Sequence, residues 1–475
     1  MNDDRDPDRS TYAAVPQRSP SMRVMPTELV YPSVPDRVSH VLRTLADAGH
    51  EVALVGGVVR DRLLGLDHRG DWDGATAARP EEVVALFEGA TWENRFGTVT
   101  IGADPAVELT SYRAEGAYRD RRRPDEVRFG VSLTEDLARR DFTINAMAWL
   151  PIDLDAGRGR LVDPHGGQSD LEARLLRAVG DPRERFAEDA LRLIRAARFA
   201  GRFDLAIETA TEAAIREQAA TVRHVSAERV RDELLRILDR DPTPSRALTL
   251  LERLGLLVVV LPEVAALRGI PQAKAVPGDA LDHSLRAVDA AQASEPPVLR
   301  LAALLHDIGK ARTLHDGHFI GHERVSAEMA AEVLRRLRVP RALSERIVGV
   351  VRHHMYDYEP AWTDAAVRRF VRRLGEVDRE LLFDLRRADN AASGVGPAGD
   401  ENQAELEARI AAQVSAEPEL LVDHRLAIDG YDLQRELGLE PGPEIGAVLD
   451  RLTELVLDDP SQNRRDLLLA HARRR

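Results

Sequence analysis

Cysteine is absent from this sequence of 475 residues. Disulfide bonds and thiolate metal sites are therefore excluded, so any bound metal ion must use histidine and carboxylate ligands. The chain also lacks a run of about 18 apolar residues, the length that a membrane-spanning helix needs. From these absences we expect a cytoplasmic protein without membrane contact.

Aromatic residues make up only 4% of the chain, and lysine occurs only at positions 274 and 310. Helices packed through Leu, Ala and Val should therefore dominate, and arginine carries almost all of the basic charge. The net charge of −14 argues at first against a nucleic-acid partner. Phosphate binding needs only a local basic surface, however. One candidate, in a solvated or substrate-facing loop, is the cluster Arg119, Arg121, Arg122 and Arg123.

The chain is too long for one hydrophobic core, so several domains are expected. Residues 1–34 are polar and proline-rich, which predicts a disordered tail. Strand and helix patterns alternate from 35 to 165, and strand patterns nearly vanish after that. The sequence thus predicts an α+β fold. A small mixed α/β head at 35–165 is followed by a long all-α body with segments at 166–265, 275–395 and 396–475.

The hydrophobic period of each segment predicts its elements. In the head, we expect strands near 51–55, 71–75, 98–101 and 107–112, and helices near 58–64 and 79–88. In the body, helical spacing of apolar residues predicts the first helices at 171–178, 187–200, 209–220 and 227–238.

The most informative pattern in the head is the pair Asp71 and Asp73. Side chains alternate along a strand, so both carboxylates face the same side. Two adjacent carboxylates repel each other unless a divalent cation lies between them. Magnesium prefers such oxygen ligands together with substrate phosphates. The pair therefore predicts a magnesium site in which Asp71 and Asp73 are metal ligands and catalytic residues.

A pair of glycines precedes these carboxylates. Gly56 and Gly57 allow the backbone to approach a phosphate closely, and the helix that follows begins with its positive end nearby. Arg60, one turn into that helix, is placed to reach a triphosphate. Together these parts indicate a nucleotidyl-transfer site, with Gly57 and Arg60 as nucleotide-binding residues.

Asp189 and Arg192 form a second candidate nucleotide contact. They are three residues apart on a predicted helix and therefore share one face. Arginine donates hydrogen bonds while aspartate accepts from an exocyclic amine, a pattern that suits cytosine and adenine. Arg195 and Arg198 continue the row and are candidate phosphate contacts. The alternative is an ordinary salt-bridged helix.

Four stretches carry a family resemblance: residues 54–65, 71–73, 135–148 and 186–199. They resemble the tRNA nucleotidyltransferase and bacterial poly(A) polymerase family, in its bacterial (class II) branch. The resemblance implies that Arg140 contacts nucleotide phosphate and that the helix at 186–199 reads the incoming base. Gly74 departs from the family pattern, which more often has a bulky apolar residue there. Glu108 is either a third acidic group of the site or a structural partner of an arginine.

A second chemical centre is predicted in the body. Its candidate ligands lie on successive predicted helices and would bind one or two divalent metal ions once folding brings them together. Residues 304–310 resemble the core motif of the His-Asp (HD) metal-dependent phosphohydrolase superfamily. The resemblance implies an unidentified divalent metal held by His283, His306, Asp307 and Asp389, with further ligands from His322, His353 and His354. A degenerate domain retained as a scaffold is the alternative.

With the stretch at 428–446 included, the resemblance spans about residues 35–475 and is greatest to actinobacterial members. It implies template-independent addition of C, C and A to the 3′ end of tRNA, from CTP and ATP and with Mg²⁺. Poly(A) synthesis is one alternative, although such members usually carry a basic extension and lack an HD region. Partial addition of CC or A, and an HD phosphohydrolase acting on RNA or nucleotide phosphates, are the others.

Overall fold

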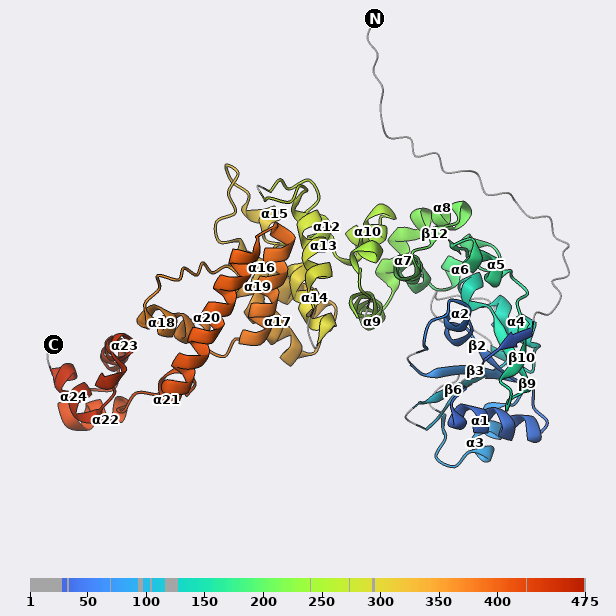
Figure 1. The fold of residues 1–475 in the computed structure, drawn as a ribbon, viewed down its shortest axis with the longest axis horizontal. Coiled ribbons are helices and arrows are strands. Elements are labelled where there is room, and N and C mark those ends of the chain that lie inside the picture. The colour runs from blue at the N-terminus through green and yellow to red at the C-terminus, as the bar shows by residue number, and fades with distance from the viewer. Residues whose placement is uncertain are drawn as a thin grey trace, which may run out of the picture. The chain divides into compact units, whose positions relative to one another are not determined.

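The computed structural model describes residues 28–31, 34–68, 70–92, 97–102, 105–115, 127–239, 241–272, 274–292, 295–423 and 425–473. Most of the predicted tail, and all of the predicted arginine cluster at 119–123, lie outside these residues. The chain divides into two compact units, one within residues 1–116 and 126–171 and the other from 172 onward (Figure 1). The first contains a sheet and the second is almost entirely helical, which confirms the predicted α+β fold.

An eight-stranded sheet forms the centre of the first unit, in the order β1-β10-β9-β2-β3-β6-β5-β4. Strands β3 and β6 run parallel, and the other neighbours run antiparallel. The strands are β1 (Glu28–Val30), β2 (Val52–Val55), β3 (Trp72–Thr76), β4 (Thr91–Trp92), β5 (Thr98–Ile101), β6 (Val107–Ser111), β9 (Ala148–Asp153) and β10 (Arg158–Val162). A separate hairpin consists of β7 (Arg113–Glu115) and β8 (Val127–Phe129).

Strand β1 lies within the segment that the sequence predicts to be disordered. It pairs with β10, and Tyr31 after it packs against Trp72 and Trp149 with ring centroids 5.7 Å apart in both cases. The Tyr31 hydroxyl also donates a hydrogen bond of 3.0 Å to the carbonyl of Val58. The prediction of disorder is therefore wrong for residues 28–31, because their partners lie far along the chain and leave no local pattern.

Helix α4 (Leu133–Ala138) covers part of one face of the sheet. Its residues Leu133 and Leu137 are buried in a core cluster with Ala75 of β3 and with residues of β2 and β9. A capping box between Ser132 and Glu135 fixes the start of this helix. The other helices of the unit are α1 (Asp36–Asp47), α2 (Gly57–Leu63), α3 (Pro80–Leu86) and α5 (Gly167–Glu172), with a 3₁₀ turn η1 at Thr143–Asn145.

The second unit is a succession of helices with one small sheet, β11 (Leu175–Leu176) and β12 (Ala206–Ile207). Its first part contains α6 (Pro182–Glu188), α7 (Leu191–Phe203), α8 (Thr209–Gln218), η2 (Ala219–His224), α9 (Ala227–Leu238), α10 (Ser245–Arg253), α11 (Leu257–Val260) and α12 (Pro262–Ala265). The middle contains α13 (Ala280–Ala290), α14 (Pro296–Leu305), α15 (Lys310–Thr313), α16 (His322–Arg336), α17 (Arg341–His353), α18 (Asp364–Leu374) and α19 (Arg379–Ser393). The last part contains α20 (Pro397–Ala416), α21 (Pro418–Leu421), α22 (Gly430–Leu437), α23 (Pro443–Asp458), η3 (Pro460–Gln462) and α24 (Arg465–Arg473).

Two predicted helices differ from the structure. The helix expected at 171–178 is wrong, because α5 ends at Glu172 and residues 175–176 form β11, which pairs in parallel with β12. The helix expected at 187–200 is interrupted, because α6 ends at Glu188 and α7 begins at Leu191. The apolar spacing across 187–200 does not reveal this break, since apolar residues recur at helical spacing on both sides of it.

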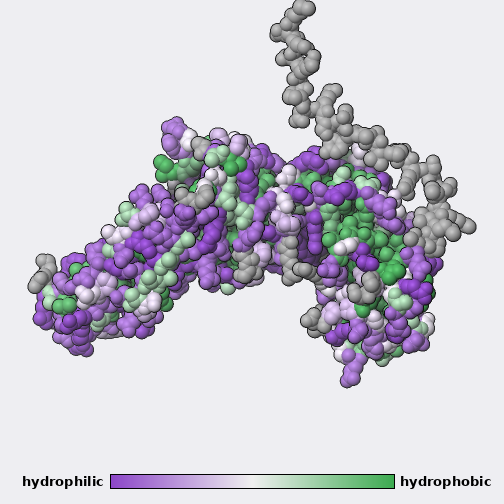
Figure 2. Space-filling view, in the orientation of Figure 1, coloured by the Kyte–Doolittle hydropathy of each residue, from purple (hydrophilic) through white to green (hydrophobic). Residues whose placement is uncertain are grey.

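Polar side chains dominate the face of the second unit drawn in Figure 2, where hydrophobic side chains form only small groups. Of the helices described, none combines the length and the hydropathy needed to cross a bilayer.

Candidate active site and metal centre

Asp71 and Asp73 lie where the sequence places them, on one side of the chain at the start of β3. Both are exposed, while Trp72 between them is only 6% exposed and packs against Tyr31 on the opposite face. Asp73 and Ala75 share the face that α4 covers further along β3, because side chains alternate. The two carboxylates therefore sit beside a covered hydrophobic core but are themselves exposed.

Glu108 lies next to this pair. It is directly opposite Asp73 in the parallel ladder between β3 and β6. Burial raises the pKa of Glu108, and the nearby carboxylates of Asp73 and Asp71 raise it further. Three carboxyl groups thus gather at one end of two adjacent strands, an arrangement that a divalent cation would stabilise.

Two residues that the sequence did not single out hold Asp71 in place. The Nδ1 atom of His68 lies 3.1 Å from the Asp61 carboxylate, and its Nε2 atom lies 2.9 Å from the Asp71 carbonyl. Burial lowers the pKa of His68, but these two hydrogen bonds, together with the negative charges of Asp61 and Asp73, leave the pKa raised. The spacing of Asp61 and His68 around a turn gives no pattern from which this bridge could be predicted.

The glycine turn after β2 is surrounded by arginines. Gly56 has φ 71° and ψ −123°, and a Cβ atom there would lie 2.9 Å from Nη1 of Arg140. Arg60 is 6% exposed, and its Nη1 donates to Oδ1 of Asn145 at 2.6 Å. Arg140 donates to the Asn145 carbonyl at 3.5 Å, so both predicted phosphate-binding arginines meet at this asparagine beside Gly57. The sequence analysis did not identify Asn145, because a single amide side chain forms no pattern of spacing with other residues.

The family departure at Gly74 has a local explanation. Gly74 is buried within β3 and pairs with Leu54 on one side and Leu109 on the other. A Cβ atom at this position would lie 2.6 Å from Cδ2 of Leu109. Leu109 therefore fills the space that a larger side chain would need, and the strand after Asp73 stays paired on both sides.

Asp189 and Arg192 do not form the helix-face pair that the sequence predicts. Asp189 has extended backbone angles in the break between α6 and α7, and its carboxylate accepts two hydrogen bonds from Arg229, at 2.6 and 3.1 Å. Arg192 instead donates to Glu188 at 2.5 Å and to the Arg185 carbonyl at 2.9 Å. The predicted pairing on one helix face is therefore wrong, because the chain breaks between α6 and α7. The role of both residues in base selection stays a prediction.

Arg195 and Arg198 surround a buried carboxylate. Glu233 of α9 is fully buried, and its oxygens lie 2.6 Å from Nε of Arg198 and 3.6 Å from Nη1 of Arg195. Arg236 donates a third contact to Glu233 at 2.7 Å. Burial lowers the pKa of Arg198 to about 10 despite the neighbouring carboxylate. In this geometry Arg198 braces α7 against α9, and its predicted contact with phosphate would require that ion pair to open.

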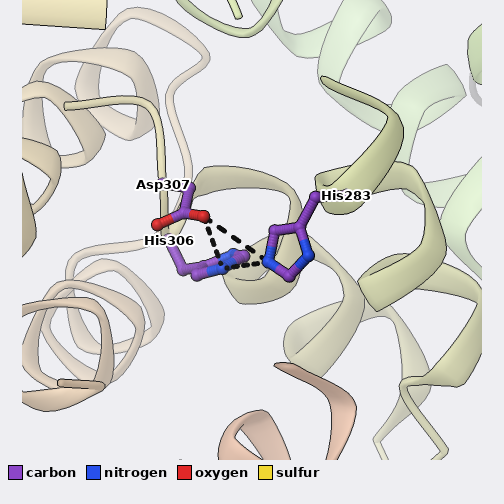
Figure 3. Close-up of side chains that lie close together, drawn as sticks. All are labelled: His283, His306 and Asp307. Atoms are coloured by element: carbon purple, nitrogen blue, oxygen red, sulfur yellow. Dashed lines mark hydrogen bonds and ion pairs between the residues drawn. The ribbon is translucent and has the colours of Figure 1, made fainter. Parts of the chain in front are cut away.

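The second centre is brought together from five helices or helix ends. His283 of α13 points its Nε2 atom toward His306 and Asp307, at 3.3 and 3.5 Å, as Figure 3 shows. The same atom lies 3.1 Å from Oδ1 of Asp389 on α19. Nε2 of His322 and Nε2 of His354 lie 3.2 and 3.7 Å from Oδ1 of Asp307. Two overlapping groups of possible ligands result: His283, His306 and Asp307, and Asp307, His322 and His354.

The hydrogen bonds around these imidazoles suit metal binding. The Nδ1 atoms of His306, His322 and His354 lie 2.7–2.8 Å from backbone carbonyls. A carbonyl only accepts, so each Nδ1 carries the proton and the lone pair of Nε2 faces the centre. The buried Nε2 atoms of His322 and His354 have no hydrogen-bond partner among the described residues. Burial also lowers the pKa of His283 and His354, which favours the neutral imidazole that a metal requires.

His353 does not join this centre, although the sequence suggests it as a ligand. It is the last residue of α17 and belongs to neither group of ligands in the described chain. Burial lowers the pKa of His353, and the charged groups that lower it further are Arg373 and Arg352. Adjacent residues at a helix end point in different directions, so His354 faces the metal centre and His353 does not.

Both lysines of the chain lie at this centre. Nζ of Lys310 is 2.6 Å from Oδ2 of Asp307, and Nζ of Lys274 is 3.5 Å from Oδ1 of Asp389. Lys310 is only 5% exposed and also donates to Gln272 at 2.9 Å. The sequence analysis did not assign either lysine, although their scarcity was a signal.

Comparison with known families covers both centres. The chain matches the Poly A polymerase head domain over residues 52–177. It matches the family described as "Probable RNA and SrmB- binding site of polymerase A" over residues 204–267, and the HD domain over residues 280–412. The deciding relative is the A-adding tRNA nucleotidyltransferase of Deinococcus radiodurans, which is 37% identical over 431 residues, 85% of this chain and 90% of the relative. This chain belongs to the tRNA nucleotidyltransferase family.

Other relatives of this nucleotidyltransferase differ in coverage. The CCA-adding enzyme of a Geobacillus species is 44% identical over 218 residues, 46% of this chain and 52% of the relative. The Multifunctional CCA protein of Halorhodospira halophila is 42% identical over 325 residues, 64% of this chain and 73% of the relative. Among solved structures, the Bacillus stearothermophilus CCA-adding enzyme in complex with CTP matches with a TM-score of 0.67 and 28% identity. That match covers 92% of this chain and 96% of the other.

Proposed function

We propose that this nucleotidyltransferase adds C, C and A to the 3′ end of tRNA, using CTP and ATP. The observation that carries the proposal is the exposed Asp71–Asp73 pair beside the glycine turn. Relatives that are named CCA-adding enzymes, and the likeness to one solved with CTP, support the substrates.

Asp71 and Asp73 are the proposed ligands of Mg²⁺, with Glu108 as a third carboxylate beside them. A magnesium ion held by these carboxylates would lower the pKa of the attacking 3′-hydroxyl and neutralise charge on the triphosphate. The backbone at Gly57 and the guanidinium groups of Arg60 and Arg140 are proposed to hold the phosphates. Asn145 would keep the two arginines at fixed positions, because it accepts a hydrogen bond from each.

Asp189 and Arg192 are proposed to select the base. Arg229 holds the Asp189 carboxylate through two hydrogen bonds, and Glu188 holds Arg192. An acceptor and a donor that are both held in this way can distinguish cytosine and adenine from uracil and guanine. In an Arg229→Gln variant, Asp189 would lose its brace, and we expect misincorporation of U or G to rise relative to C and A.

The test is nucleotide incorporation into tRNA transcripts that end before the CCA sequence, after C, or after CC. Incorporation of C, C and then A supports the proposal. Addition of A alone to the CC transcript would instead assign the activity that the name of the Deinococcus relative states. Long A tails would indicate a poly(A) polymerase.

A double Asp71→Ala, Asp73→Ala variant supplies the control for this assay. Both side chains are exposed, so the variant should fold normally while losing incorporation on all three transcripts. An Asp47→Ala, Asp67→Ala variant is the matched comparison, because it removes two exposed carboxylates of the same unit outside β3.

A second activity is proposed for the HD centre: hydrolysis of a phosphate ester with a divalent metal held by His283, His306, Asp307, His322, His354 and Asp389. The facing Nε2 atoms and the unpartnered nitrogens of His322 and His354 support metal binding there. A metal in this position supplies a polarised water and neutralises the phosphate. Phosphate release from p-nitrophenyl phosphate with Mn²⁺, Ni²⁺ or Mg²⁺ tests it, and an Asp307→Asn variant should be inactive.

A further inference from the structure

A pocket of about 480 Å³ lies in the second unit, beside the residues that follow His354. One wall is the segment 355–362, and the other is α18. Its aromatic lining consists of Tyr356, Trp362 and Phe370, with ring centroids 5.2 Å apart for Tyr356 and Phe370 and 5.7 Å for Trp362 and Phe370. The volume suits a single small ligand.

The pocket is held open by hydrogen bonds outside it. The hydroxyl of Tyr356 donates to Gln403 at 2.8 Å, and Arg409 donates to the Trp362 carbonyl at 2.7 Å. Both anchors come from α20, so the segment 355–362 is fixed at both ends. The aromatic surface therefore exists before any ligand arrives, which reduces the entropic cost of binding.

The charged side chains that line the pocket are two arginines, Arg369 and Arg373, and one exposed carboxylate, Asp357. Arg369 is already paired with Glu454 and Asp458, at 2.8 and 2.6 Å. Arg373 is exposed and makes no ion pair within the described chain, and its guanidinium lies 5.4 Å from the centre of the Phe370 ring. A cation beside aromatic rings suits a ligand that is flat, aromatic and negatively charged.

The pocket is linked to the metal centre through His354. Arg386 donates to the His354 carbonyl at 3.4 Å, and its guanidinium lies 4.9 Å from the centre of the Tyr356 ring. A ligand on the aromatic wall would therefore lie close to one of the metal-ligating helix ends.

We infer that this pocket binds the base and the phosphate of a nucleotide and is the recognition subsite of the HD centre. The role as a recognition subsite rests on the hydrolytic activity proposed above. The base stacks on Trp362, and Arg373 holds a phosphate. Free nucleotides and the terminal nucleotide of an RNA strand share this chemistry.

The experiment uses the full chain in EDTA, so that no hydrolysis occurs. Tryptophan fluorescence is recorded during titration with AMP, and separately with a 3′-phosphorylated RNA trinucleotide. The titrations are made in the Asp71→Ala, Asp73→Ala background, which disables the proposed nucleotide site of the first unit, where the three other tryptophans lie. Quenching should occur in this background and disappear when Trp362→Phe is added. Loss of the charge-assisted contact in Arg373→Gln should weaken binding by about tenfold or more.

The matched control is Arg341→Gln. It removes one exposed positive charge from the first residue of α17, the end of that helix away from the pocket, and this variant should bind the nucleotide as the wild type does. The inference is overturned if adding Trp362→Phe leaves the quenching unchanged, or if Arg373→Gln binds as tightly as Arg341→Gln. Binding of AMP alone would identify a free nucleotide as the ligand, and binding of the trinucleotide alone would identify an RNA end.

The hydrolytic proposal and the pocket inference can fail independently. Release of phosphate from p-nitrophenyl phosphate without nucleotide binding in EDTA would overturn the pocket inference and leave the metal activity. Nucleotide binding without phosphate release would support the pocket and overturn the hydrolysis.

Discussion

Replacing Glu233 by glutamine should destabilise the second unit strongly, although the shape of the side chain is kept. Glu233 is fully buried and contacts three arginines, of which Arg198 is only 8% exposed. Removing the carboxylate leaves the Arg198 cation buried without its partner. Breaking a buried ion pair in this way costs about 3–5 kcal/mol. For a unit of this size, we expect its melting temperature to fall by roughly 5–8 °C.

Differential scanning calorimetry of the full chain measures this effect, because separate transitions can be followed for separate units. The matched control is Glu217→Gln, which removes an exposed partner of Arg183 at 2.8 Å. An exposed pair contributes at most about 1 kcal/mol, so the control should change little. Equal melting temperatures for the two variants would refute the structural role of Glu233 and would favour phosphate binding as the main task of Arg198.

The same carboxylate should make stability depend on pH. Burial raises the pKa of Glu233, but Arg198, Arg195 and Arg236 lower it more, so the folded value lies below the ordinary 4.5. The ion pairs therefore stabilise the fold above pH 4.5, and this contribution is lost as the pH falls through the folded pKa. In Glu233→Gln, this part of the acid sensitivity should be missing from melting temperatures recorded between neutral pH and pH 3.

Two further predictions concern the centres themselves. Gly56→Ala should lower nucleotide incorporation more than Gly49→Ala, because both positions have positive φ but only Gly56 would push a Cβ against Arg140. Unfolding experiments should show a cost of about 1 kcal/mol or more from backbone strain in each, and equal activities would contradict the role of the contact. At a metal concentration of 100 times its Kd, a bound ion should stabilise the second unit by about 2.7 kcal/mol. Calorimetry with and without EDTA should show this gain in His353→Ala but not in His354→Ala, and its survival in His354→Ala would exclude that residue as a ligand.

The local parts of this protein were predictable from its sequence. Alternation along a strand places Asp71 and Asp73 on one side of β3, and the order of glycine turn, arginine and carboxylates is preserved in the fold. The HD motif likewise identified His306 and Asp307, which adjoin one helix end. Such features depend on neighbours within a few residues, and their geometry follows from backbone periodicity alone.

The partners of these residues were decided by packing between distant segments. Arg229 donates to the carboxylate of Asp189, and Arg198 donates to Glu233. The two lysines contact the carboxylates of Asp307 and Asp389 at the second centre. The separations in sequence between most of these partners are too large for a periodic pattern to predict the contacts. The break between α6 and α7 belongs to the same class, because it is stabilised where Asp189 meets α9. A sequence pattern records which side of a helix or strand a residue occupies. The contacts made across that side depend on how separate elements are brought together, because a buried charge is tolerated only where an opposite charge or hydrogen bonds compensate for its lost hydration.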